Sequence, residues 1–149
     1  MITVTSRMSH GRYATYFSVK ALAFIVMIAA LGAVVSVPLG YLSKALNILP
    51  MLPFGSPQLL AGVHVLWLLI ASLYTRSTGS ALVTGLVKGL IETTFFSAQG
   101  ITAIPISLVE GLLLETGLFF LGSINKVSLA VSGGLSAVGN VIVLRLLFL

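Results

Sequence analysis

Long apolar segments are the feature that most constrains how this chain can fold. Of its 149 residues, 58% are hydrophobic and only 7% are charged, whereas a soluble domain usually has about 25% charged residues. Water alone could not solvate such a surface, so lipid must cover most of it. Inside lipid, helices are favoured because they satisfy their backbone polar groups within one segment. The sequence therefore predicts an all-α, polytopic transmembrane helical bundle.

Five segments have the roughly 17–25 apolar residues that a helix needs to cross a bilayer. Prolines and short polar turns separate them, and we expect one domain over residues 1–149. The first segment follows basic residues, as in a secretion signal, but it lacks a convincing cleavage pattern at its end, so we expect a retained helix. The predicted spans are Lys20–Val37, Gln58–Tyr74, Ser80–Phe96, Ile104–Leu121 and Val127–Phe148.

The segment Leu39–Leu52 is apolar but, at 14 residues, too short to span comfortably. We expect a short helix at the outer face, which is either an ordinary interfacial helix or a lid over a cavity.

The distribution of Lys and Arg predicts the orientation, because basic residues favour the cytoplasmic side of a membrane. With the N-terminus in the cytoplasm, only Lys44 and Arg145 lie outside. We therefore predict a cytoplasmic N-terminus in the cell membrane. The basic residues predicted to lie on the cytoplasmic side are Arg7, Arg12, Lys20, Arg76 and Lys126.

Polar residues inside a membrane are costly and need a partner or a cavity. At about 1.5 Å of rise per residue, five polar or aromatic residues fall at similar depth in the outer part of four spans. A carboxylate cluster beside an indole suits a cationic or nitrogen-heteroaromatic solute. Helix packing and interhelical hydrogen bonds are the structural alternatives. The candidate substrate-binding residues are Glu110, Trp67, His64, Glu92 and Asn140.

Two deeper charges, Lys88 and Glu115, are predicted to form a structural ion pair. Lys88 could instead pair with Glu92, which follows four residues later on the same helix face. Glu110 and Glu115 are about 140° apart around a helix, so they cannot face the same point. We therefore expect Glu110 to face a ligand and Glu115 to meet Lys88.

Small residues form a second pattern, because they let helices approach closely. Ala29 and Ala33 stand four residues apart on the first span, and glycines recur on the third and fifth. Such faces serve either packing within the bundle or docking onto another membrane subunit.

Several functions are excluded or disfavoured by what the sequence lacks. It has no G-x-x-x-x-G-K-[ST] loop for ATP phosphates and no H-E-x-x-H or G-x-S-x-G motif. It has no Cys, and its two His residues are too far apart to suggest a metal site. Its basic residues are scattered, which argues against nucleic-acid binding. We expect no cofactor and no enzymatic activity.

Several short stretches carry a family resemblance: Tyr41–Asn47, Leu66–Trp67, Arg76–Leu82 and Val109–Glu115, together with the acid Glu92. Through these stretches, the region Leu39–Phe120 resembles the substrate-binding (S) components of energy-coupling factor vitamin transporters. The closest type is the permease for thiamine or its hydroxymethylpyrimidine precursor.

The resemblance implies a bundle that captures a vitamin near the outer face, beneath the first loop. It also implies a transmembrane coupling subunit and two ATPase subunits as partners. By the same resemblance, Glu110 faces the cationic ring of the ligand, and Ala29 and Ala33 dock onto the coupling subunit. This sequence departs from the family pattern in two respects. Members usually have six helices, whereas five are predicted here, and in the hydroxymethylpyrimidine type Gln is commoner than Glu at the position of Glu110.

Two other functions fit the same residues. A structural or assembly subunit of a membrane complex would use the polar side chains to hold helices together. A small dimeric exporter would carry protons on Glu92 or Glu115. The prediction is a substrate-binding subunit of an ATP-driven vitamin uptake transporter.

Overall fold

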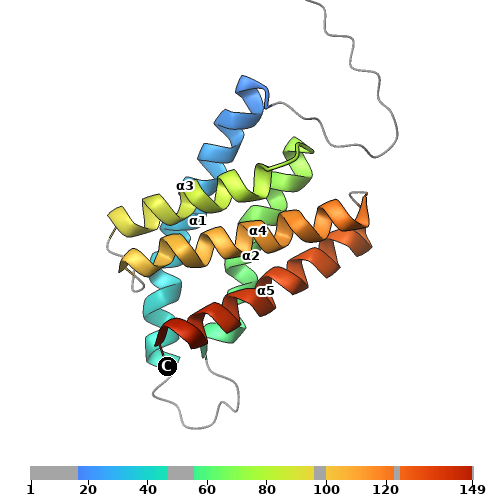
Figure 1. Cartoon of the computed structure of the whole chain (residues 1–149). Coiled ribbons are helices and arrows are strands. Elements are labelled where there is room, and N and C mark those ends of the chain that lie inside the picture. Colours follow the sequence, from blue (N-terminus) through green and yellow to red (C-terminus); the bar gives the residue numbers. More distant parts are fainter. Residues whose placement is uncertain (1–16, 47–55, 96–99, 123–124, 149) are drawn as a thin grey trace, which may run out of the picture.

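The computed structural model describes residues 17–46, 56–95, 100–122 and 125–148, in which each predicted span is helical (Figure 1). No strand occurs in these ranges, so the all-α class is confirmed. Helices α2, α4 and α5 begin and end within two residues of the predicted spans, and α3 begins at the predicted Ser80. The helices are α1 (Val19–Leu46), α2 (Ser56–Thr75), α3 (Ser80–Thr94), α4 (Ala103–Leu121) and α5 (Lys126–Phe148), with a 3-10 turn η1 (Gly100–Thr102) before α4.

Helix α1 departs most from the prediction. It runs for 28 residues and continues through Pro38, so the break after Val37 and a separate helix starting at Leu39 are wrong. The rest of the predicted lid, residues 47–52, lies outside the described residues. Proline removes one backbone hydrogen bond, but transmembrane helices tolerate it where neighbouring groups compensate. At about 42 Å long, α1 exceeds a bilayer core of about 30 Å, so it must tilt or extend beyond that core.

Three helical segments are long and apolar enough to cross a membrane: α1, Gly100–Leu121 and Lys126–Val143. Helix α2 contains a shorter apolar segment, Ala61–Thr75, and α3 has 15 residues. Large hydrophobic side chains are exposed along the bundle, among them Phe119, Phe120 and Leu146, as expected of a surface covered by lipid. That α2 and α3 also cross the bilayer stays a prediction.

Ala29 and Ala33 face the interior of the bundle. Both are fully buried, and α1 packs against α2 and α3. Between them on the same helix, Gly32 lies against the indole of Trp67, and an added Cβ there would lie 2.8 Å from the ring carbon Cγ. The predicted docking role of these alanines is therefore wrong, because the small side chains serve close packing within the chain.

Helices α3 and α4 approach closely because glycines line their contact. A Cβ added at Gly111 would lie 2.8 Å from the carbonyl oxygen of Ala81 and 3.0 Å from Cα of Leu82. A Cβ added at Gly85 would meet the carbonyl oxygen of Ser107. Since these neighbours are backbone atoms, an added methyl group can be accommodated only if the two helices separate.

Gly111→Ala is therefore expected to destabilise the bundle by about 1–3 kcal/mol, the usual cost of overpacking. The measurement is the thermal unfolding midpoint of the purified protein in detergent. Gly134→Ala is the matched control, because an added Cβ there meets nothing within 4 Å and Ala favours a helix more than Gly does. Equal midpoints for the two variants would contradict the close α3–α4 contact.

Candidate functional site

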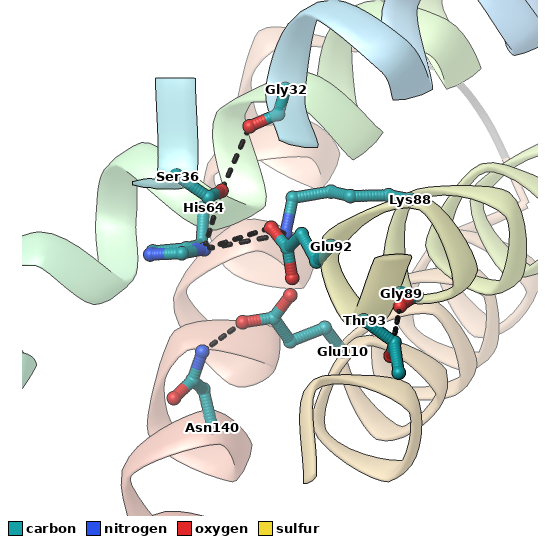
Figure 2. A network of polar contacts seen from close by, with 9 residues as sticks. All are labelled: Gly32, Ser36, His64, Lys88, Gly89, Glu92, Thr93, Glu110 and Asn140. Atoms are coloured by element: carbon teal, nitrogen blue, oxygen red, sulfur yellow. Dashed lines mark hydrogen bonds and ion pairs between the residues drawn. The ribbon is translucent and has the colours of Figure 1, made fainter. Parts of the chain in front are cut away.

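Side chains from all five helices meet in one polar cluster inside the bundle (Figure 2). Its charged and amide members are almost fully buried, with exposed fractions of 2% or less, and His64 is partly buried. The cluster is therefore a point of contact among all five helices. The members are Ser36 of α1, His64 of α2, Lys88 and Glu92 of α3, Glu110 of α4 and Asn140 of α5.

An ion pair within α3 forms one half of the cluster. Lys88 and Glu92 stand four residues apart, which places them on one helix face, and Lys88 Nζ lies 2.7 Å from Glu92 Oε1. The same ammonium lies 3.2 Å from His64 Nδ1. Because an ammonium can only donate hydrogen bonds, Nδ1 must accept, and the neutral ring then carries its proton on Nε2.

Ser36 links this half of the cluster to α1. Its hydroxyl oxygen lies 3.3 Å from His64 Nδ1 and donates a 2.8 Å hydrogen bond to the carbonyl oxygen of Gly32. Ser36 is not among the binding residues predicted from the sequence. The available signal was a hydroxyl side chain in an otherwise apolar stretch of the first span.

The other half of the cluster joins α4 to α5. Asn140 Nδ2 donates a hydrogen bond to Glu110 Oε1, and one turn earlier the Ser136 hydroxyl donates to the Glu110 carbonyl oxygen at 2.8 Å. Two buried acceptors, Glu110 Oε2 and Asn140 Oδ1, have no hydrogen-bond partner among the described residues. The carboxyl groups of Glu92 and Glu110 point toward one another (Figure 2).

The charges in the cluster balance only if one carboxyl group is protonated. With both ionised, Lys88 supplies one positive charge against two negative ones, and no cation within the described ranges forms an ion pair with Glu110. An uncompensated buried charge is costly. The cluster is therefore suited to a partner that brings one positive charge or several N–H donors.

Of the five predicted binding residues, the structure brings together His64, Glu92, Glu110 and Asn140. Trp67 lies instead against Gly32 and against a core cluster of α2, α3 and α4 side chains. Its indole Nε1 is buried and has no hydrogen-bond partner in the described part of the chain. A binding role for these five residues stays a prediction.

The predicted ion pair between Lys88 and Glu115 is wrong. Lys88 pairs with Glu92, the alternative considered from the sequence, and Glu115 binds the start of α3. Its Oε1 accepts from the backbone N–H of Gly79 at 2.6 Å, and its Oε2 accepts from that of Ala81 at 3.3 Å. The first N–H groups of a helix lack partners within that helix and favour a nearby negative charge, which explains why Glu115 lies there.

Comparison with known families gives one finding. The sequence model of a family described as the permease component of the ABC-type cobalt transport system matches residues 20–139. The match includes part or all of each helix and every cluster residue except Asn140. No curated protein and no solved structure gives a significant match.

Proposed function

Because the chain belongs to the family of permease components of ABC-type cobalt transport systems, we propose that it is the substrate-binding subunit of an ATP-driven uptake transporter for thiamine or its hydroxymethylpyrimidine precursor. Membership makes the chain a multi-pass membrane component that works with ATPase subunits, and a transport permease is not an enzyme. The vitamin substrate, a separate transmembrane coupling subunit and the location in the cell membrane belong to the proposal.

The observation that carries the proposal is a pair of acceptors, Glu110 Oε2 and Asn140 Oδ1, that have no hydrogen-bond partner among the residues the structure describes. Buried acceptors without a donor cost about 1–3 kcal/mol each, so a bound molecule that donates to them gains that free energy. The amino group of a 4-aminopyrimidine ring supplies two N–H donors. Thiamine adds the single positive charge that the cluster lacks.

The proposed orientation places the cluster toward the outside. Lys20, Arg76 and Lys126 are exposed at the end of the bundle where α1 starts and where the α2–α3 and α4–α5 turns lie (Figure 1). Basic residues favour the cytoplasmic side. Glu92 lies near the opposite end of α3, two residues before Thr94, so a solute from outside has the shorter route to it.

The family description also makes cobalt a candidate substrate. His64, Glu92 and Glu110 are residue types that ligate metals. In the described ranges, however, no group of three His, Cys, Asp or Glu residues is placed to hold a metal ion. An ammonium group also lies within 3.2 Å of both His64 Nδ1 and Glu92 Oε1. These observations favour an organic substrate.

Ligand binding to the purified protein tests the proposal. Trp67 is the only tryptophan in the chain, so its fluorescence reports on the bundle interior without labelling. We expect a saturable change with thiamine or hydroxymethylpyrimidine and none with Co²⁺. A response to Co²⁺ alone would replace the vitamin by the metal as substrate.

Two other outcomes identify the competing functions. Absence of binding to any of these solutes would favour a structural subunit. Proton-coupled transport in liposomes without an ATPase would favour an autonomous exporter.

A further inference from the structure

We propose that Lys88 is a specificity-determining residue that excludes divalent metal ions from the polar cluster. This inference rests on the proposed function, because it concerns the same site. It starts from a disagreement between the family description, which names cobalt, and the cluster itself, whose centre holds an ammonium group.

The position of the ammonium relative to its neighbours carries the argument. His64 Nδ1 and Glu92 Oε1 are 3.9 Å apart, somewhat wider than the ~3.4 Å between two ligands of a tetrahedral ion with bonds of about 2.0–2.2 Å, so a small side-chain shift would bring both onto one ion. Lys88 Nζ lies 3.2 Å from the nitrogen and 2.7 Å from the oxygen. An ion that bound both atoms would have to occupy space that the ammonium now holds.

The remaining groups around that position are also metal-binding types. The Glu110 carboxyl group points toward Glu92 (Figure 2), and both Glu110 Oε2 and Asn140 Oδ1 lack hydrogen-bond partners in the described part of the chain. Imidazole nitrogen and carboxylate or amide oxygen are ligands that divalent transition metals accept. The cluster thus holds ligand types for an ion, but with Lys88 at its centre no three His, Cys, Asp or Glu residues in the described ranges are placed to hold one.

Charge supports the same conclusion. With Lys88 present, two ionised carboxylates leave the cluster one negative charge, which matches a monocation. Without Lys88 the cluster would carry two negative charges, which match a divalent cation. Repulsion between an ammonium and a divalent ion a few ångströms apart is strong where water is scarce, so one side chain can decide between the two classes of substrate.

The test is Co²⁺ binding to the purified full chain, measured by titration calorimetry and by the visible absorption of bound Co²⁺. The variants are Lys88→Met and Lys88→Gln, which remove the charge, and Lys88→Arg, which keeps it. We expect both neutral variants to bind Co²⁺ saturably, and the wild type and Lys88→Arg to show no saturable binding over concentrations reaching at least about tenfold higher. Co²⁺ should also raise the melting temperature of the neutral variants only.

Two controls keep the result interpretable. The double variant Lys88→Met with Glu92→Gln lacks both charges of the pair and should not gain Co²⁺ binding. If Lys88→Met fails to fold, Lys88→Gln still answers the question, because its amide can donate to Glu92.

Two outcomes overturn the inference: saturable Co²⁺ binding by the wild type, or folded neutral variants that bind Co²⁺ no better than the wild type. Thiamine binding by the wild type is scored separately. A failure of the proposed function, with no vitamin bound, is therefore distinct from a failure of the role assigned to Lys88.

Discussion

Removing either partner of the Lys88–Glu92 pair is expected to destabilise the bundle by about 3–5 kcal/mol, while replacing both should cost less than either single change. Each side chain is at most 1% exposed, and the two lie 2.7 Å apart. A single substitution leaves a buried charge without its partner. Replacing both residues removes the pair together with the cost of burying it.

The measurement is a double-mutant cycle with Lys88→Met, Glu92→Leu and the combined variant, followed by denaturant unfolding in detergent. The control is Thr93→Ala on the same helix, where the lost hydroxyl donates to the carbonyl oxygen of Gly89 four residues before it. We expect the control to change the free energy of unfolding by less than about 1 kcal/mol. Additive effects of the two single substitutions would show that the pair does not couple in the folded protein.

Segment length and hydropathy predicted most of the fold. Apolar stretches of spanning length define helices because lipid offers the backbone no other hydrogen-bond partners, and α2, α4 and α5 follow the predicted bounds closely. The same reasoning failed at Pro38. Rules for proline come largely from helices in water, where a lost backbone hydrogen bond ends a helix more readily than it does among packed transmembrane neighbours.

The depth of a side chain along its helix could be predicted from the sequence. The neighbour that its helix face points toward could be predicted only in part. A constant rise per residue placed His64, Glu92, Glu110 and Asn140 at similar depth, and the structure brings their side chains together. Spacing alone could not show which way the face of Ala29 and Ala33 points, because a face of small residues serves internal and external packing equally well.

Contacts between distant parts of the chain explain the remaining errors. Glu115 binds backbone N–H groups of Gly79 and Ala81, more than thirty residues earlier. Backbone donors are present at every residue except proline, so they leave no mark in a sequence. Side-chain charges alone therefore predicted Lys88 as the partner of Glu115.

Glu110→Gln is expected to weaken thiamine binding about 100-fold, within the range for losing hydrogen bonds to a charged group. The substitution keeps the size of the side chain but removes the negative charge that the cluster directs at a cation. Binding of hydroxymethylpyrimidine, which is uncharged, should weaken less, because the Gln oxygen can still accept from an amino group. The measurement is the fluorescence titration of Trp67 with both compounds.

Glu115→Gln is the matched control, since it makes the same chemical change five residues later on the same helix. Glu115 binds the first N–H groups of α3, so this variant should lower the free energy of unfolding by about 1–3 kcal/mol and lower the melting temperature with it. The affinity for thiamine should not change. If both variants lost affinity equally, the loss would follow from general destabilisation. Unchanged thiamine binding in Glu110→Gln would remove Glu110 from the binding site and, with it, the charge argument for a cationic substrate.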